Sequence, residues 1–154
     1  MEKKQPIEIK VDTLLLEKYG LPVYKTPGSA GMDLVSCTNE CFVIKPGQTA
    51  VLHTGLYISI NNPELVALVC GRSGLYFNHN IRVGNGIGVI DSDYHGEIMV
   101  MLHNDDVSEY IVEPGERIAQ LLFMPVVQVQ MTVVAVFSVT TKRSEGGFGH
   151  TGRI

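Results

Sequence analysis

Residues 42–70 read FVIKPGQTAVLHTGLYISINNPELVALVC, and this stretch decides the fold class. Val, Ile, Tyr and Phe, which favour pleated and half-buried backbone, recur in three runs, partly with period-two alternation. Between the first two runs, Pro46-Gly47 presets one turn dihedral with proline and supplies a permissive one with glycine. The stretch therefore predicts three strands, at Phe42–Ile44, Ala50–Ile60 and Leu65–Cys70.

The same pattern continues on both sides of this stretch. Pro27-Gly28 and Pro114-Gly115 mark further turns, and helical signal is confined to Thr13–Tyr19 and to the turn after Arg72. An alternating strand and helix architecture is thereby excluded, and one all-β domain is expected, a sandwich, jelly roll or barrel. Further strands are predicted at Ile7–Val11, Glu97–Leu102, Glu109–Val112 and Ile118–Phe137.

The apolar residues from Leu121 to Phe137 are nearly continuous, a pattern that calls for burial on both faces of the segment. Two explanations stay open. The segment is a central strand of the chain's own sandwich, or it is an extended arm added to the sheet of a neighbouring subunit. After Thr140 the sequence becomes polar and rich in glycine, which is typical of a mobile tail.

Composition excludes several classes of protein. The chain has 154 residues, 45% of them hydrophobic, and a formal net charge of −4, so it suits one domain without a broad basic field. Stable binding of nucleic acid or of an anionic membrane is therefore not expected. The three cysteines contain no CxxC, and the N-terminus has no signal-peptide core. A cytoplasmic location is expected, with the nucleus as the alternative in a eukaryotic or viral source.

Gly71-Arg72-Ser73-Gly74-Leu75 follows a predicted strand and opens a turn. Its glycines allow close approach of a ligand, successive amides can form an anion nest, and the arginine offers a forked donor to phosphate oxygens. The structural alternative is a plain glycine turn with a surface arginine. On its own the motif does not decide between them.

Residues 84–97, GNGIGVIDSDYHGE, read as a strand, a turn and a returning strand with two carboxylates beside a tyrosine. Glycine backbone can admit a flat ring, and a carboxylate at the mouth of such a hairpin can act on water. The alternative is that Asp91 and Ser92 cap a turn while Tyr94 packs. Asp91 and Asp93 share a face if the strand is regular, so their spacing does not identify the base.

The tail contains GxGxxG at Gly147, Gly149 and Gly152, but only two residues follow, so a dinucleotide fingerprint is excluded. The tail does carry arginines, a hydroxyl and one aromatic ring on a hinge-rich segment, which suits closure over a ligand. The five histidines are scattered, without HxH or HExxH. Any metal is therefore expected to be a hard cation that arrives with phosphates and keeps most of its waters.

Five motifs, taken together and in order, resemble the trimeric dUTPase family over nearly the whole chain. They are AGMDL at 30–34, RSGL at 72–75, GVIDSDYHG at 88–96, PGERIAQL at 114–121 and RSEGGFGHTG at 143–152. The resemblance implies a jelly-roll-like subunit of the β-clip type with one short helix, assembled as a homotrimer whose active sites are shared. It also implies a β-domain over residues 1–139, a flexible lid over 140–154, and magnesium-assisted hydrolysis of dUTP to dUMP and pyrophosphate.

The resemblance also implies roles for individual residues. Asp91 would activate the attacking water, and Asp33 would hold waters of a magnesium ion carried mainly by the triphosphate. Asn85 and nearby backbone would read uracil, with Tyr94 under the deoxyribose, and the tail would close over the substrate. The full set of implied substrate contacts is Arg72, Ser73, Gly74, Asn85, Gly88, Asp91, Tyr94, Met99, Gln120, Arg143, Phe148, Gly149 and Thr151. Arg117 is expected to be structural.

Departures from the family pattern are small, and two rivals are weaker. Gly71 stands where many relatives have proline, which loosens one turn. A dCTP deaminase, which shares the fold, favours a second serine after Arg-Ser and a catalytic glutamate, whereas Gly74 and the Asp-Ser-Asp-Tyr run stand here. A non-catalytic jelly-roll protein is disfavoured by the intact Asp33, Asp91, Arg143 and Phe148.

Overall fold

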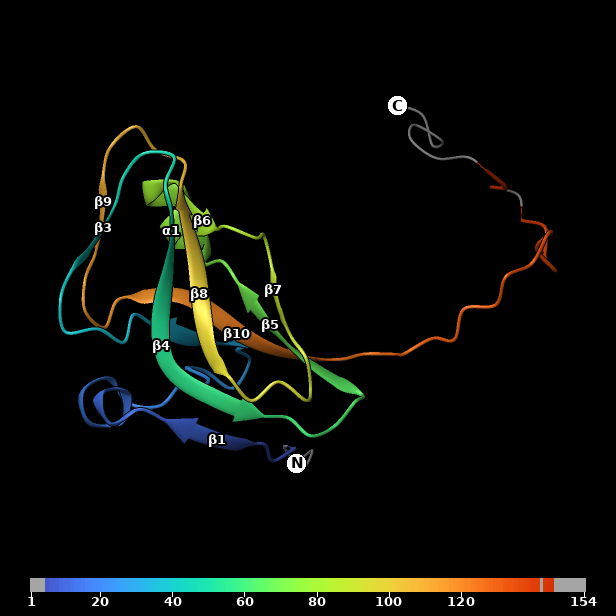
Figure 1. Ribbon diagram of the computed structural model, residues 1–154, viewed down its shortest axis with the longest axis horizontal. Helices are drawn as coiled ribbons and strands as arrows, with labels where there is room; N and C mark the ends of the chain where they lie inside the picture. The colour runs from blue at the N-terminus through green and yellow to red at the C-terminus, as the bar shows by residue number, and fades with distance from the viewer. Residues whose placement is uncertain (1–4, 142, 146–154) are drawn as a thin grey trace.

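The computed structural model describes residues 5–141 and 143–145, and it forms two packed four-stranded sheets with antiparallel pairing (Figure 1). The first sheet has the order β1 (Glu8–Val11), β4 (Thr49–Ser59), β8 (Glu97–Asn104), β6 (Ile81–Val83). The second has the order β2 (Gly31–Val35), β10 (Arg117–Pro125), β5 (Leu65–Cys70), β7 (Gly88–Ile90). A two-stranded ribbon pairs β3 (Phe42–Ile44) with β9 (Tyr110–Val112). The predicted all-β fold of jelly-roll type is confirmed.

The core lies between the sheets and follows from the alternation in the sequence. In β8 every second residue, Ile98, Val100 and Leu102, is fully buried, while Met99 and Met101 face outward. Across the core, Val69 of β5 and Leu121 of β10 are buried to a similar degree. Each such side chain contributes roughly 1.5–3 kcal/mol by leaving water, so the frame that carries the connecting loops is rigid.

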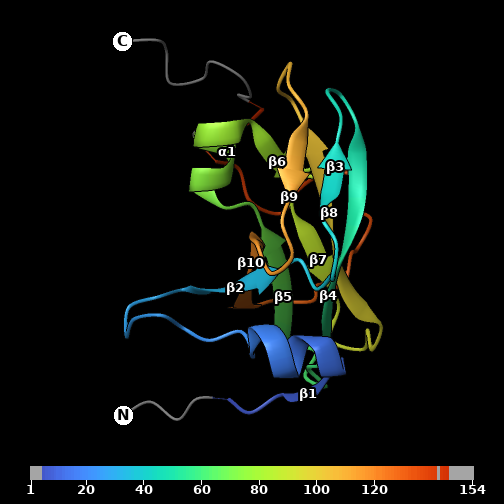
Figure 2. The ribbon, with the colours of Figure 1, turned by 90° about the vertical axis from the view of Figure 1, so that its left-hand side faces the viewer.

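Two short helices lie at opposite ends of the molecule (Figure 2). The α-helix α1 (Ser73–His79) directly follows β5, at the predicted turn after Arg72, and ends at Asn80 in the left-handed conformation. The π-helix η1 (Leu15–Tyr19) lies inside the predicted Thr13–Tyr19 segment and inserts the buried Leu15 into the core. None of the helices in the described part of the chain is long and apolar enough to cross a membrane.

The predicted Ile118–Phe137 strand is wrong in its second half. β10 ends at Pro125, and after one more backbone bond, from Val126 N to Glu64 O (2.8 Å), the chain leaves the folded body (Figure 1). Its apolar side chains beyond that point are exposed, from 54% for Val134 to 100% for Val133. The segment is therefore no central strand of the chain's own sandwich, and the arm explanation is the one that stays open.

Candidate active site

The strand register gathers the first group of predicted site residues. Gln120 in β10 pairs with Asp33 in β2 on one side and with Cys70 in β5 on the other. The chain leaves β5 at Cys70, so Arg72 emerges beside Asp33 at this end of the second sheet. We call Asp33, Arg72, Arg117 and Gln120 the arginine cluster.

Side-chain bonds hold the arginine cluster together. Arg72 Nε donates to Asp33 Oδ1 at 2.9 Å, and Arg72 Nη1 donates to the carbonyl oxygen of Arg117 at 3.1 Å. Arg117 Nη1 lies 3.4 Å from the other oxygen of the Asp33 carboxylate. Gln120 Nε2 donates to the carbonyl oxygen of Gly71 at 2.9 Å. Arg117, expected to be structural, therefore contacts Asp33, the carboxylate predicted to serve the metal. Sequence reasoning missed this contact because the two residues lie far apart in the sequence.

The amides of Ser73 and Gly74 extend this cluster. Both residues lie in the first turn of α1, where helical amides have no intrahelical acceptor and so can donate to an anion. The Arg72 and Asp33 side chains are 28% and 21% exposed, so solvent and ligands can reach them. With the neighbouring amides, the guanidinium groups make a site suited to phosphate oxygens.

The available ligand atoms determine which metal ion this end of the second sheet could bind. Asp33 supplies one carboxylate, already shared by two arginines, and the described residues contain no group of three His, Cys, Asp or Glu side chains. A single carboxylate oxygen fits an outer contact to the waters of a hard cation that phosphates already hold.

The second group of predicted residues lies on the 84–97 loop, where the chain crosses between the sheets. β6 and β8 belong to the first sheet and β7 to the second, so β7 and β8 pair with different neighbours. Gly86 makes the first crossing with φ +77°, and its amide donates to Val83 O at 3.0 Å. This differs from the expected paired hairpin: the returning strand joins the opposite sheet.

The functional side chains of the 84–97 loop are exposed. Asp91 accepts, through its backbone oxygen, a bond from Tyr94 N at 3.2 Å, which closes a turn. Asp91 and Asp93 therefore lie on a turn and not on a regular strand. Tyr94 is 39% exposed and donates its hydroxyl hydrogen to Glu97 O at 2.9 Å. The structure also places three further predicted residues on or beside the loop: Asn85, Gly88 and Met99.

The two groups lie at opposite ends of β5. Ile90 pairs with Ala67, so Asp91 lies beyond the start of the paired region, while Arg72 follows the end of β5. At ~3.3 Å per residue, the six steps along the chain from Val66 to Arg72 span about 20 Å. Figure 1 shows α1 and the loop between β7 and β8 at these two ends. One chain therefore does not bring Asp91 to the arginine cluster.

Of the predicted tail residues, the structure describes Arg143 alone. It is exposed, beyond a segment that has left the folded body, and Ser144 N donates to Thr141 O at 3.1 Å beside it. Phe148, Gly149 and Thr151 lie outside the described residues, so their predicted contacts stay predictions.

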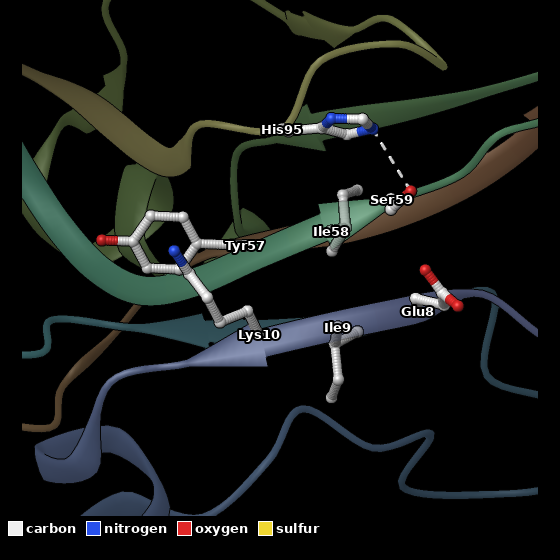
Figure 3. Close-up of a pocket in the computed structure, with 7 residues that line it drawn as sticks. All are labelled: Glu8, Ile9, Lys10, Tyr57, Ile58, Ser59 and His95. Atoms are coloured by element: carbon white, nitrogen blue, oxygen red, sulfur yellow. Dashed lines mark hydrogen bonds between the residues drawn. The ribbon is translucent and has the colours of Figure 1, made fainter.

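A groove of about 350 Å³ lies on the outer face of β1 and β4 (Figure 3). Lys10 Nζ lies 4.2 Å from the centroid of the Tyr57 ring, and His95 Nε2 lies 3.3 Å from Ser59 Oγ. Burial, followed by the charges of Asp12 and Glu97, raises the pKa of Tyr57. None of the predicted site residues lines the groove, although His95 is a direct neighbour of Tyr94.

A half-buried phenol, that of Tyr110, lies near the arginine cluster. Tyr110 donates to the carboxylate of Glu116, and Glu116 also accepts from Glu113 N at 2.9 Å. Burial first, and then the bond to Glu116, raises the pKa of Tyr110, whereas the charge of Arg72 lowers it. Tyr110 thus lies within the field of Arg72 and steadies the turn that precedes Arg117.

Comparison with known proteins agrees with this arrangement. The family model described as dUTPase matches residues 17–152. Deoxyuridine 5'-triphosphate nucleotidohydrolase of Cronobacter sakazakii is 47% identical over 153 residues, covering 99% of each chain. The same-named protein of Klebsiella pneumoniae subsp. pneumoniae is 46% identical over the same length and coverage.

A solved structure extends the likeness to the fold. The dUTPase of Staphylococcus bacteriophage 80alpha, solved with dUPNHPP, has a TM-score of 0.84 at 27% identity and matches 97% of this chain and 99% of that one. The matches in sequence and in fold cover both the arginine cluster and the 84–97 loop. The chain is therefore a member of the dUTPase family of enzymes.

Proposed function

We propose that this protein hydrolyses dUTP to dUMP and pyrophosphate with magnesium, and so limits uracil incorporation into DNA and supplies dUMP for dTMP synthesis. The observation that carries the proposal is the division of the motif residues into two polar groups within a dUTPase-family chain. The arginine cluster suits a triphosphate, and the 84–97 loop offers a carboxylate beside an aromatic ring.

The active sites are shared between the chains of a homotrimer. The separation of about 20 Å between Asp91 and Arg72 along β5 is too great for one triphosphate within one chain, so a neighbour supplies the other group. The exposed apolar arm supports this assembly. Residues 127–139 extend over about 40 Å at ~3.3 Å per residue, far enough to cover an adjacent subunit.

The phosphate contacts come from one end of the second sheet. Arg72, the amides of Ser73 and Gly74, and Gln120 bind the phosphate oxygens of the substrate. Because Arg72 is bonded to Asp33 in the free chain, the incoming triphosphate competes for its guanidinium group. Asp33 would hold the waters of a magnesium ion carried by the triphosphate, and that ion, when bound, would offset the charge of the pyrophosphate leaving group.

The 84–97 loop supplies the nucleoside contacts and the base. Asn85, the Gly88 backbone and Met99 contact uracil, and the Tyr94 ring lies against the deoxyribose. Asp91 takes a proton from a water molecule while the oxygen of that water attacks the α-phosphorus in line. The bond from that phosphorus to the bridging oxygen breaks, and pyrophosphate leaves.

The tail closes the site. Arg143 and Thr151 contact the β- and γ-phosphates, Phe148 stacks on uracil, and Gly149 gives the lid its close backbone approach. Exclusion of water strengthens each polar contact made to the transition state. The cytoplasmic location and the lack of stable nucleic-acid or membrane binding stay predictions.

Release of pyrophosphate from dUTP, dCTP, dTTP and UTP, each with and without magnesium, tests the proposal. The expected result is rapid magnesium-dependent release from dUTP, with the other three nucleotides slower by a factor of at least about 10². Equal rates for dUTP and dCTP, or release of ammonia in place of pyrophosphate, would contradict it.

A further inference from the structure

The ring of Tyr94 lies against the backbone of Gly96, two residues further along the loop. A Cβ atom at position 96 would lie 2.5 Å from Tyr94 Cζ and 2.9 Å from Cε2, and closer still to the phenol oxygen. Atoms at these separations overlap, so any side chain at position 96 displaces the ring. The φ angle of Gly96 is not in the left-handed region. The glycine is therefore required for space and not for backbone conformation.

The hydroxyl group of Tyr94 is anchored to the first sheet. It donates to the backbone oxygen of Glu97, the first residue of β8. The Glu97 carboxylate is 13% exposed and takes three bonds, from His53 Nδ1 (2.8 Å), Thr54 N (3.1 Å) and Gly55 N (2.9 Å). Those donors lie where the pairing of β4 with β8 shifts register, between His53 and Tyr57. The Glu97 side chain thus joins β8 to β4, and these bonds fix the position of the Glu97 backbone oxygen that accepts from the phenol.

The other side of the loop is tied to the same strand. Figure 3 shows His95 joined to Ser59 near the end of β4, with Lys10 crossing the ring of Tyr57. Tyr57 pairs with Glu97 in the register of β4 and β8. Bonds from His95 and Glu97 to β4 therefore hold the segment from Tyr94 to Glu97 in place. Within this segment, Gly96 and Glu97 restrict the rotation of the Tyr94 ring.

We propose that Gly96 and Glu97 are positioning residues for sugar recognition. The space at Gly96 admits the ring of Tyr94, and the Glu97 carbonyl oxygen fixes its rotation, so that the ring stands where a ribose 2'-hydroxyl would collide with it. This inference rests on the proposed function, because it takes Tyr94 to contact the deoxyribose.

A double-mutant cycle on Tyr94→Ala and Gly96→Ala tests the proposal, with the ratio of kcat/KM for dUTP to that for UTP as the readout. Gly96→Ala is expected to lower this ratio about tenfold or more, in a protein that still melts cooperatively. In the double variant, Gly96→Ala should add nothing to Tyr94→Ala, because its effect passes through the ring. An unchanged ratio in Gly96→Ala, or effects that multiply in the double variant, would overturn the proposal.

Gly28→Ala is the matched control, because an added Cβ at that exposed turn meets nothing within 4 Å. It should leave the ratio and the melting temperature unchanged. If Gly96→Ala does not fold, Tyr94→Phe decides, since it keeps the ring and removes only the bond to Glu97 O. A several-fold lower ratio supports the proposal, and an unchanged ratio overturns it.

These outcomes separate the inference from the proposed function. A wild-type protein that does not hydrolyse dUTP refutes the proposed function itself. If Tyr94→Ala keeps full discrimination against UTP, the role of the ring is wrong, and the inference falls with it. A neutral Gly96→Ala beside a disruptive Tyr94→Ala refutes only the positioning role.

Discussion

The arginine cluster and the 84–97 loop are built in opposite ways. In the cluster, side chains from β2, β10 and the turn after β5 bond to each other, so the charges are ordered before any ligand arrives. In the loop, backbone bonds and the Tyr94 hydroxyl set the shape, while Asp91 stays exposed. A substitution in the arginine cluster is therefore expected to change both the stability and the activity of the protein. At the loop, a substitution of Asp91 is expected to change the activity and leave the stability intact.

The largest effect is expected for Asp91→Asn. The amide keeps the size of the side chain but cannot take a proton from water, so turnover should fall by a factor of about 10² to 10⁴. Because this exposed carboxylate makes no side-chain hydrogen bond within the described part of the chain, the melting temperature and dUTP binding should stay near wild type. Stopped-flow pyrophosphate release and calorimetry measure both properties.

Asp93→Asn is the control for that substitution, since it removes the same charge two residues away on the same turn. It should retain most of the activity. If Asp93→Asn is inactive and Asp91→Asn is active, the base has been assigned to the wrong carboxylate.

For Arg72→Lys we expect a smaller loss of activity together with a loss of stability. Lysine keeps the charge, but it cannot bond Asp33 and the Arg117 carbonyl oxygen at once, so about 1–2 kcal/mol of stability should be lost. The activity should fall about tenfold to a hundredfold, because the forked contact to phosphate is lost as well. Urea unfolding and kcat/KM for dUTP give the two values.

Arg82→Lys is a close match for comparison. Arg82 also bonds one carboxylate, Asp105 Oδ2 at 2.7 Å, and one carbonyl oxygen, Gly84 O at 3.2 Å, but it lies in the first sheet. Its substitution should lower stability by a similar amount and leave kcat/KM within about twofold. Equal losses of activity in the two variants would mean that Arg72 acts through stability alone.

The smallest effect concerns Tyr110, which lies near the arginine cluster. The pKa of Tyr110 is raised by burial and by the bond to Glu116, so the native phenol holds its proton more tightly than the unfolded one, whose pKa is about 10. The stability from this difference is complete below about pH 10 and is lost as the pH rises further. Tyr110→Phe should cost about 1 kcal/mol at neutral pH and should flatten the alkaline decline of the urea midpoint. An equally steep decline in both proteins would remove Tyr110 as the cause.

Strand positions with strong local signals were predictable from the sequence. Phe42–Ile44 and Leu65–Cys70 are strands with those bounds, because β-branched residues between turn signals leave no competing structure. β2 and β6 were missed. β2 carries Gly31 and Asp33, which read as loop residues, and its pairing with β10 depends on contacts distant in sequence. The end of β10 at Pro125 was missed because the apolar pattern continues into the arm.

The candidate site divides in the same way. The motif residues were identified from their order, but their distribution over two ends of β5 follows from register, which no local pattern reveals. The contact of Arg117 with Asp33 and the packing of Tyr94 on Gly96 are likewise products of tertiary structure. Motif order identified the candidate residues, but it could not predict that one chain keeps Asp91 apart from the arginine cluster.

The shared site is tested most directly by mixing two inactive variants, Asp91→Asn and Arg72→Ala, by joint unfolding and refolding. If each site takes Asp91 from one chain and Arg72 from a neighbour, about a quarter of the sites in randomly mixed trimers are intact. The account predicts that the refolded mixture regains about that fraction of wild-type dUTP hydrolysis, while each variant refolded alone stays inactive. A mixture as inactive as its components would show that both groups must come from one chain, and would contradict the account.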